Sequence, residues 1–490
     1  MPADILSQIS AQVDRDRNEL LAAIAESVKI PSVRQEPVEE MPFGEPINRA
    51  LEHALGVGEQ LGFRVGRLGG YAGWIDYGKG DELIGVLSHV DVVPIGNEND
   101  WEHPPFGAEV VDGMMYGRGT ADDKGPLFST LYGLKAVRDL GLPLTKRIRI
   151  ILGTDEESGW GGVKRYLASE EIPSCAFSPD GLFTAVNREK GITVLRIVGC
   201  EPFRADRGLR LAYLRGGTAP NNVPDEAIAC LKGTASSTGI IEDHIREWMR
   251  HRPDAAFDLQ IENDGDSVLI ISKGRAAHAM VPEEGINAIA ELLGLLSRLE
   301  IAEDGATKFT SLLNDQIGLD TTGASLGIAW SDEPSGALTL NLGQIKVDAQ
   351  QAFAVLDIRS PVSITCDDVV DAVTKALLEA DDTIEIEVQK RSEPLYLPAD
   401  HPLIETLSRA YHKVTGLPPI LHSIGGGTYA RAIQNCVCFG AIYPDEEITV
   451  HRPNERASIE RMILNAKVYG FALYELAKQP EEEVNKWNST

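Results

Sequence analysis

The chain has 490 residues, which is too long for one ordinary domain and suits about two or three. Hydrophobic residues make up 43% of it, enough to bury a sizeable core. The 46 basic and 74 acidic residues give a formal net charge of −28, which disfavours a nucleic-acid-binding protein and argues against docking on an anionic membrane surface. A diffuse acidic surface is more often a solubility feature.

The beginning of the sequence does not resemble a secretion signal. Asp4 stands where a signal peptide has basic residues, and no apolar segment precedes Arg15. No run approaches the roughly 18 apolar residues of a membrane span. The cysteines are sparse and scattered, which favours reduced structural thiols and predicts a cytoplasmic protein. They are Cys175, Cys200, Cys230, Cys366, Cys436 and Cys438.

The first 190 residues alternate between helix and strand patterns. Residues 4–27 carry apolar positions at helical spacing and predict one amphipathic helix. Apolar runs at 83–90 and 148–153 predict buried strands, and 125–141 predicts a helix that ends at a glycine. Buried strands that alternate with helices predict a mostly parallel α/β sheet.

The middle of the chain changes character. Residues 191–199, 268–271 and 338–342 predict strands that are partly polar, while 285–299 and 367–380 predict amphipathic helices. Asn263-Asp264-Gly265 is a hairpin-type turn signal. This mixture predicts an α+β insertion at 191–393, between two parts of an α/β domain at 1–190 and 394–490. The second part ends in a helix predicted at 458–476.

Two candidate motifs come first in the chain. His89 and Asp91 close the first apolar strand, where ligands gather in open α/β sheets, and a carboxylate near a histidine can fix the tautomer of a metal-binding imidazole. A glycine-rich loop at 116–125 contains Asp122 and Asp123 and could cradle an anion. Taken alone, an H-x-D pair is common and this loop can be an ordinary turn; it lacks the pattern of a phosphate-binding loop.

Three further motifs carry acids and a second histidine. Glu156 and Glu157 directly follow the strand at 148–153, Asp180 follows a short apolar segment, and His451 lies near the end of the chain. Each could belong to a solvated loop. Together, two imidazoles and several carboxylates at segment ends suit two divalent ions of the zinc, cobalt or manganese type, with one carboxylate bridging them. Such a pair of ions makes a hydrolytic site.

These segments, in this order, resemble the M20 family of di-metal peptidases and amidohydrolases over nearly the whole chain, and especially its dipeptidase V-like branch. The matching motifs are LSHVDVVP, YGRGTADDKGP, TDEESG, SPD, GGGTYAR and VHRPNE. The resemblance implies a zinc-exopeptidase-like α/β fold, with a mostly parallel sheet and helices on both faces. It also implies a catalytic domain at 1–190 and 394–490 and an inserted α+β lid domain at 191–393.

The same resemblance implies a complete set of metal ligands. One divalent ion binds His89 and Asp180, the other binds Glu157 and His451, and Asp122 bridges the two. Zinc is the first expectation for both ions, and manganese and cobalt suit the same ligands.

For the reaction, the resemblance implies a dipeptidase in which a metal-bridging hydroxide attacks the peptide carbonyl. Glu156 is then the general base that later protonates the leaving amine, and Asp91 orients His89. The peptide bond between Asp122 and Asp123 is expected to be cis.

Four residues of the insertion and its surroundings match one catalytic and three substrate-binding positions of the family. His278, in the segment GRAAHA, is expected to donate to the oxyanion of the tetrahedral intermediate. Asn221, or its neighbour Asn222, and Arg359 match clamping positions, and a guanidinium suits the carboxylate of a substrate. Gly426 would present its backbone N–H to the same end, although a plain glycine turn is the alternative.

The expected partners are dipeptides, with no nucleic acid and no membrane. A long lid of this branch replaces the partner subunit, so the resemblance implies that a monomer can be active. The main alternative is an M20 amidohydrolase of other specificity: an N-acyl amino acid deacylase, a carboxypeptidase or a succinyl-diaminopimelate desuccinylase. A metal-binding protein that has lost catalysis is a third hypothesis, against which the intact Glu156 argues.

Overall fold

The computed structural model describes residues 4–199, 208–233, 238–261 and 266–478. The chain forms two compact units, which we describe separately. Unit 1 comprises the chain up to Asn187, Leu397–His422 and the chain from Thr428 onward; unit 2 comprises Arg188–Tyr396 and Ser423–Gly427. The insertion predicted at 191–393 falls within unit 2, whereas no sequence feature indicated that Ser423–Gly427 groups with it.

The large sheet of unit 1 has a parallel centre. Its strand order within the described residues is β1-β2-β6-β3-β7-β21-β8-β19, with β20 beside β8. The strands are β1 (Arg64–Leu68), β2 (Ala72–Tyr77), β3 (Leu83–His89), β6 (Arg147–Gly153), β7 (Cys175–Ser178), β8 (Ala185–Glu189), β19 (Leu395–Tyr396), β20 (Leu421–Ile424) and β21 (Cys436–Cys438). The adjacent strands β6, β3, β7 and β21 pair in parallel, and the outer pairs are antiparallel. β3 is buried along its whole length, as its apolar run predicted.

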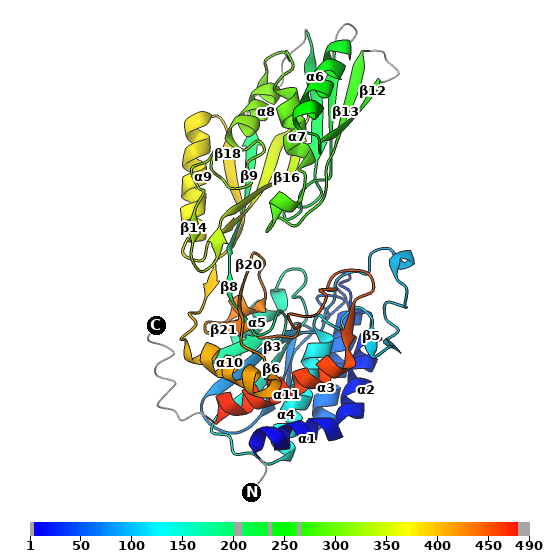
Figure 1. Cartoon of the computed structure of the whole chain (residues 1–490), viewed down its shortest axis with the longest axis vertical. Helices are drawn as coiled ribbons and strands as arrows, with labels where there is room; N and C mark the ends of the chain where they lie inside the picture. Colours follow the sequence, from blue (N-terminus) through cyan, green and yellow to red (C-terminus); the bar gives the residue numbers. More distant parts are fainter. Residues whose placement is uncertain (1–3, 200–207, 234–237, 262–265, 479–490) are drawn as a thin grey trace. The chain divides into compact units, whose positions relative to one another are not determined.

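Helices cover both faces of this sheet. They are α1 (Ile5–Arg15), α2 (Arg17–Val28), α3 (Glu45–Gln60), α4 (Lys124–Asp139), α5 (Gly161–Ser169), α10 (Pro402–Thr415) and α11 (Ile459–Ala477), shown in Figure 1. On β2, Gly73 lets the side chain of Leu51 from α3 lie close to the strand. The next residue, Trp74, points to the opposite face and meets Tyr166 of α5 edge to face. The strand and helix patterns at 83–90, 148–153, 125–141 and 458–476 are thus confirmed as β3, β6, α4 and α11.

One expected helix is in fact two. Residues 4–27 were predicted as a single helix, but α1 ends at Arg15 and α2 begins at Arg17. Between them, the Asp16 carboxylate accepts a hydrogen bond from Lys135 Nζ of α4 at 2.8 Å. Apolar spacing alone could not reveal this break, because the partner of Asp16 lies 119 residues further along the chain.

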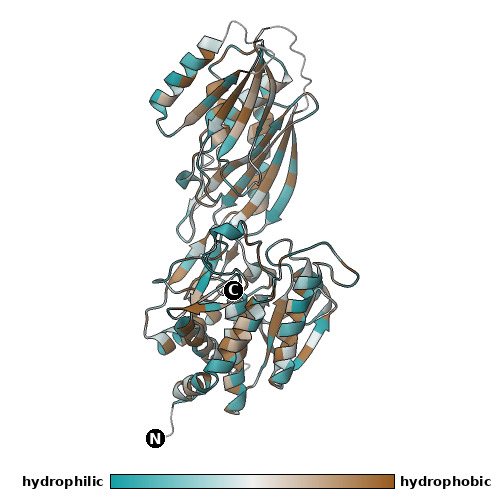
Figure 2. Ribbon diagram, turned by 90° about the vertical axis from the view of Figure 1, so that its right-hand side faces the viewer, coloured by the Kyte–Doolittle hydropathy of each residue, from teal (hydrophilic) through white to brown (hydrophobic). Residues whose placement is uncertain are grey.

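Unit 2 is built on a separate antiparallel sheet of order β12-β13-β11-β10-β16-β17-β9-β18. Its strands are β9 (Gly191–Gly199), β10 (Arg210–Gly216), β11 (Glu226–Lys232), β12 (Ala256–Ile261), β13 (Ser267–Lys273), β16 (Thr339–Val347), β17 (Ala352–Ser360) and β18 (Glu385–Ser392). Its helices are α6 (Thr238–His251), α7 (Ala288–Leu296), α8 (Gly305–Gln316) and α9 (Cys366–Ala380). In Figure 2 hydrophobic residues concentrate on the strands and on the inner sides of the helices.

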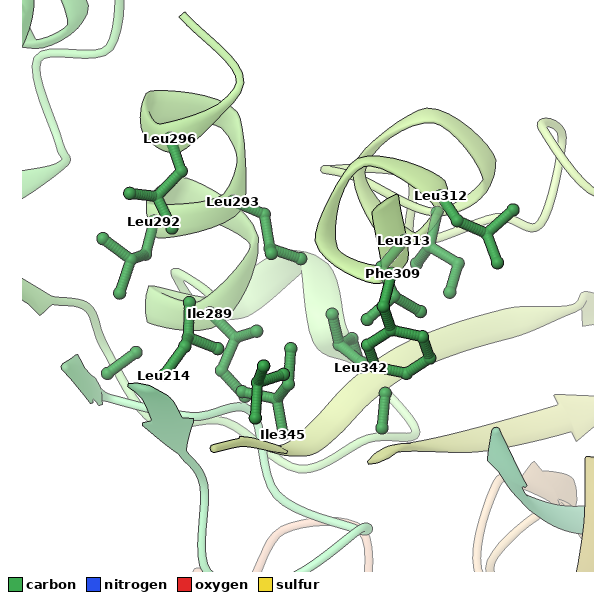
Figure 3. Packing of buried hydrophobic residues seen from close by; sticks show 14 of the residues in the cluster. Leu214, Ile289, Leu292, Leu293, Leu296, Phe309, Leu312, Leu313, Leu342 and Ile345 are labelled. Carbon is green, nitrogen blue, oxygen red and sulfur yellow. The ribbon is translucent and has the colours of Figure 1, made fainter. Parts of the chain in front are cut away.

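The core of unit 2 lies between the sheet and its helices. Figure 3 shows Leu293 of α7 and Phe309 of α8 directed toward Leu342 and Ile345 of β16. α7 is shorter than the helix predicted at 285–299, because the Asn287 side chain caps it by accepting hydrogen bonds from the next two free N–H groups. This core is distinct from that of unit 1, so each unit buries its own apolar surface.

Two sequence expectations concern thiols and membranes. The cysteines within the described residues (175, 230, 366, 436 and 438) are free and buried, as expected for structural thiols. Cys200 and the turn signal Asn263-Asp264-Gly265 lie outside the described residues. Within the described chain, no helix has the length and apolarity that crossing a membrane requires.

Candidate metal centre

The sheet of unit 1 brings the predicted ligands together. β6, β3 and β7 are neighbouring parallel strands, so their carboxyl ends meet at one edge of the sheet. His89 is the last residue of β3, Glu156 and Glu157 follow β6, and Asp180 follows β7. The loop before α4 supplies Asp122 to the same place.

Asp122 lies between the two histidines. Its Oδ1 is 3.0 Å from His89 Nε2, and its Oδ2 is 3.0 Å from His451 Nε2. Glu157 Oε1 lies 3.1 Å from the same nitrogen of His451, and Asp180 Oδ2 lies 3.9 Å from His89 Nε2. Each carboxylate oxygen of Asp122 therefore faces a different imidazole, which is the arrangement that a bridging ligand needs.

The hydrogen bonding of two candidate ligand atoms favours a bound metal ion. His89 Nε2 and Asp122 Oδ1 are both buried and lie 3.0 Å apart, and neither has another hydrogen-bond partner. His89 Nδ1 lies 2.9 Å from the backbone oxygen of Asp91, which can only accept, so Nδ1 carries the proton and a neutral ring leaves Nε2 free as a ligand. Buried polar atoms with so few partners are rare in native proteins, and a cation bound between these two would satisfy both.

Two overlapping groups of side chains could each hold an ion. The ligand atoms of His89, Asp122 and Glu157 all lie within 4.8 Å of one another, and so do those of His89, Glu156 and Asp180. The sequence placed Glu157 in the ligand set and Glu156 outside it as the base. Geometry alone allows Glu156 to be a ligand as well.

Crowding of acids makes the centre strongly negative. Burial, followed by the charges of neighbouring acids, raises the pKa of Glu156 and Asp180 well above their ordinary values. Burial also acts to raise the pKa of Asp122, but the two imidazoles outweigh it and hold that pKa below its usual range. Positive charge is therefore needed at this position, and protons and metal ions compete to supply it.

Asp91 and Asp123 accept hydrogen bonds from the backbone of the proposed ligands and of Glu156. The Asp91 carboxylate accepts hydrogen bonds from the backbone N–H groups of Glu156 at 3.2 Å and Glu157 at 3.1 Å. Asp91 thus ties the end of β3 to the loop that follows β6. The Asp122–Asp123 peptide bond is cis, as expected, and the Asp123 carboxylate accepts from the His89 N–H at 3.2 Å.

The predicted catalytic His278 and the three predicted substrate-binding positions lie in unit 2. The N–H of Ala279, next to His278, donates to the backbone oxygen of Asn221 at 2.9 Å, and Asn222 forms a β-bridge with His278. Arg359 Nη1 donates to the Gly425 oxygen at 2.7 Å, beside Gly426. The structure therefore joins these positions pairwise through backbone contacts, and it leaves the choice between Asn221 and Asn222 open.

His278 and Arg359 each have N–H groups that are held in place by a neighbouring residue. His278 Nδ1 accepts a hydrogen bond from the Met280 N–H at 3.1 Å, so the neutral ring carries its proton on Nε2. Partial burial and the Arg359 guanidinium lower the pKa of His278, which favours this neutral form. The Asp357 carboxylate engages Nε and Nη2 of Arg359, so only part of the guanidinium is left for another acceptor.

One aromatic residue near the centre received no role from the sequence. Tyr429 is buried, its ring lies 6.2 Å from that of His89 and 5.4 Å from that of Trp160, and its hydroxyl has no hydrogen-bond partner. It belongs to the motif GGGTYAR, so its position in the motif was visible. Its packing against β3 could not be predicted from the sequence.

Comparison with known proteins identifies the family of the chain. The family profile described as "Peptidase family M20/M25/M40" matches residues 85–475. The Bacillus subtilis (strain 168) protein named "Putative dipeptidase YtjP" is 37% identical over 471 residues, which cover 95% of this chain and 99% of that protein. The Staphylococcus haemolyticus protein "Putative dipeptidase SH1171" is 32% identical and covers 92% of this chain and 95% of its own.

Solved structures show the same fold at low identity. Human carnosine dipeptidase 1 superposes with a TM-score of 0.57 at 16% identity, over 98% of this chain and 100% of that one. The di-peptidase Dug1p from Saccharomyces cerevisiae gives a TM-score of 0.57 at 14% identity, over 97% and 99% of the two chains. The profile match over most of the chain and the near full-length relatives lead to one conclusion: this chain belongs to peptidase family M20/M25/M40.

Proposed function

We propose that this protein is a dipeptidase whose active site is built around two divalent ions. The observation that carries the proposal is Asp122, whose two carboxylate oxygens each lie 3.0 Å from a different histidine. The near full-length relatives named as dipeptidases support the choice of substrate class. A cytoplasmic location and a monomeric state stay predictions from the sequence.

The ligand assignment follows the sequence. His89 and Asp180 hold one ion, Glu157 and His451 hold the other, and Asp122 bridges them. Mixed nitrogen and oxygen donors suit zinc, manganese or cobalt better than calcium. When bound, such a pair of ions lowers the pKa of a water molecule and polarises the peptide carbonyl.

Glu156 is the general base in this proposal. Burial among acids raises its pKa well above the ordinary carboxyl value in the absence of ions, and bound cations act in the opposite direction. A carboxylate tuned by these opposing effects can take a proton from water and return it to the leaving amine. Asp91 holds the Glu156 backbone at 3.2 Å, so the base sits on an anchored loop.

Unit 2 supplies the substrate-binding groups in this proposal and acts as the lid. His278 offers its Nε2 proton to the developing oxyanion, because its Nδ1 is already engaged by Met280. Arg359 offers its remaining N–H groups to the carboxylate of the dipeptide. Asn221 and the backbone N–H of Gly426 complete the proposed set.

The first test is a substrate panel. Metal-free protein is reloaded with zinc or manganese and assayed on free dipeptides, a tripeptide, an N-acetyl amino acid and N-succinyl-diaminopimelate. Cleavage confined to dipeptides is the expected result. Cleavage mainly of the acylated compounds would overturn the dipeptidase assignment in favour of an amidohydrolase of other specificity.

A pair of neighbouring substitutions tests the role of Glu156. Glu156→Ala is expected to lower turnover by about 10²- to 10⁴-fold while two ions still bind, because a general base contributes about that much. Glu157→Ala, the matched variant, is expected to lose an ion. Metal content by mass spectrometry and turnover are measured on both; loss of an ion from Glu156→Ala would make Glu156 a ligand.

A further inference from the structure

A buried ion pair joins two of the sequence motifs that carry proposed ligands. Arg118 Nη1 lies 2.6 Å from Glu455 Oε2, and both residues are almost completely buried, at 1% and 0% exposure. Arg118 precedes Asp122 by four residues, and Glu455 follows His451 by four residues. The pair therefore joins the segment just before Asp122 to the segment just after His451.

The other oxygen of Glu455 gathers the backbone of the Asp122 loop. Oε1 accepts hydrogen bonds from Gly119 N at 2.9 Å, Ala121 N at 3.1 Å and Asp122 N at 3.3 Å. The backbone oxygen of Glu455 also accepts from Gly117 N at 2.9 Å. One buried side chain thus determines the path of the loop up to the proposed bridging ligand itself.

Arg118 reaches two other loops. Its Nη1 donates to the Arg452 oxygen at 3.3 Å, in the loop of His451. Its Nη2 donates to the Pro94 oxygen at 3.3 Å, in the segment that follows Asp91. The guanidinium therefore contacts the segments that follow both histidines.

The backbone of His451 needs such a constraint. Its φ of 63° lies in the left-handed region, which residues other than glycine rarely adopt and which surrounding contacts must maintain. A buried ion pair is a poor source of net stability, because desolvation of both charges offsets their attraction. Its value here lies in the geometry that it imposes on the two loops.

We propose that Arg118 and Glu455 are positioning residues that set the placement of Asp122 relative to His451, and so the affinity for the ion that Glu157 and His451 hold. The inference rests on the proposed function for its ligand assignment. Neither residue belongs to the proposed ligands or to the proposed substrate-binding groups. Loss of groups that hold metal ligands in place typically lowers metal affinity about 10- to 100-fold.

The test is a metal titration of Glu455→Gln. A glutamine has one carbonyl oxygen, so it cannot accept both from Arg118 and from the three backbone N–H groups. Cobalt(II) is added to metal-free protein and followed by visible absorption and by calorimetry. We expect the weaker of the two binding steps to lose about 10- to 100-fold in affinity, and the cobalt spectrum to change, while the tighter step changes less.

A second, partly buried ion pair in the same unit provides the control. Arg149 binds Asp76 through Nε at 2.7 Å and Nη2 at 2.9 Å, between β6 and β2. Within the described residues, the Asp76 carboxylate bonds no loop that carries a proposed ligand. Asp76→Asn should lower the melting temperature and leave both cobalt affinities within about twofold. If Glu455→Gln behaves in the same way, the Arg118–Glu455 pair is merely structural and the inference is wrong.

The double variant Arg118→Met, Glu455→Gln separates positioning from folding, and it also serves if Glu455→Gln alone fails to fold. It removes both buried charges, and the glutamine carbonyl oxygen still offers an acceptor to the backbone N–H groups of the Asp122 loop, so stability is expected to be largely preserved. We expect a melting temperature near that of the wild type with cobalt binding still weakened, because the contacts of Arg118 to the Arg452 and Pro94 oxygens are lost; recovery of both would overturn the inference. Wild-type protein that binds two ions but cleaves no dipeptide would instead refute the proposed function and leave the positioning role standing.

Discussion

At the scale of single residues, the hydrogen bond that one ring nitrogen of a histidine makes determines whether the other nitrogen carries a proton. His89 bonds the Asp91 oxygen through Nδ1, and His278 accepts from Met280 through Nδ1. The first contact frees Nε2 of His89 as a ligand, and the second places the proton of neutral His278 on Nε2. The two histidines thus present opposite groups on Nε2, a lone pair in His89 and an N–H in His278, which suit the different roles proposed for them.

Arg359 provides a residue-scale prediction. Asp357 accepts from its Nε and Nη2, which orients the remaining N–H groups. Asp357→Asn removes a charge-assisted fork, so KM for dipeptides should rise about tenfold or more, because such hydrogen bonds contribute about 1.5–3 kcal/mol. The value of kcat should change less, since the carboxylate of the substrate is bound equally in ground and transition states.

The control for this change is Asp243→Asn, which breaks an exposed ion pair on α6 of the same unit. Steady-state kinetics on one dipeptide should give wild-type values for it. An unchanged KM for Asp357→Asn would show that Arg359 does not hold the substrate carboxylate.

At the scale of elements, the two helices that follow the loops of Asp122 and His451 pack closely against each other. α4 begins two residues after Asp122, and α11 begins eight residues after His451. A Cβ on Gly133 of α4 would lie 2.6 Å from the Ala466 oxygen and 2.7 Å from Gly470 N, both in α11. The Ser129 hydroxyl also donates to the Met462 oxygen at 3.0 Å. The close crossing therefore anchors the ends of both loops, where the helices begin.

Gly133→Ala is therefore expected to destabilise unit 1. The added methyl group must push the two helix backbones apart, at a cost of about 1–3 kcal/mol in the free energy of unfolding. Gly56→Ala in α3 is the matched control, because a Cβ there meets nothing within 4 Å. It should stabilise the protein by about 0.5–1 kcal/mol. Denaturant unfolding of both variants checks the opposite signs, and equal effects would contradict the close crossing.

At the scale of the whole molecule, buried histidines link stability to pH. His401 caps α10, where its Nδ1 accepts from the Leu403 N–H at 3.2 Å, and burial lowers its pKa below 6.5. Between the unfolded pKa near 6.5 and the lower folded pKa, the unfolded chain binds the proton more readily. The stabilisation is complete above pH 6.5 and is lost as the pH falls through this window.

His401→Asn should reduce this acid sensitivity. Asparagine is a good helix cap and does not titrate, so stability near pH 8 should be kept while the fall below pH 6.5 becomes shallower, by at most about 1.4 kcal/mol per pH unit. His401→Ala should flatten the profile equally but lose about 1 kcal/mol at every pH, because the cap is gone. Melting temperatures from pH 5 to 8 measure both, and a wild-type slope in His401→Asn would refute the linkage.

Local pattern and motif order determined much about this protein. Continuous apolar runs predicted β3 and β6, because a strand buried on both faces has no polar alternation to show. The positions of the proposed ligands at strand ends followed from the same reasoning, since parallel strands bring their carboxyl ends to one edge. The family resemblance added the pairing of those residues with ions. In the structure, His89 and His451 each lie 3.0 Å from a carboxylate oxygen of Asp122, and Glu157 lies 3.1 Å from His451.

Only the tertiary structure decided features that depend on contacts between distant segments. The break between α1 and α2 depends on Lys135, the close crossing of α4 and α11 on Gly133 and Gly470, and the Asp122 loop on Glu455. Glu455 stands 333 residues from the N–H that it holds, and no local pattern records such a distance. A sequence shows which side chains are present and how the chain is locally patterned, whereas burial decides which distant groups must satisfy one another.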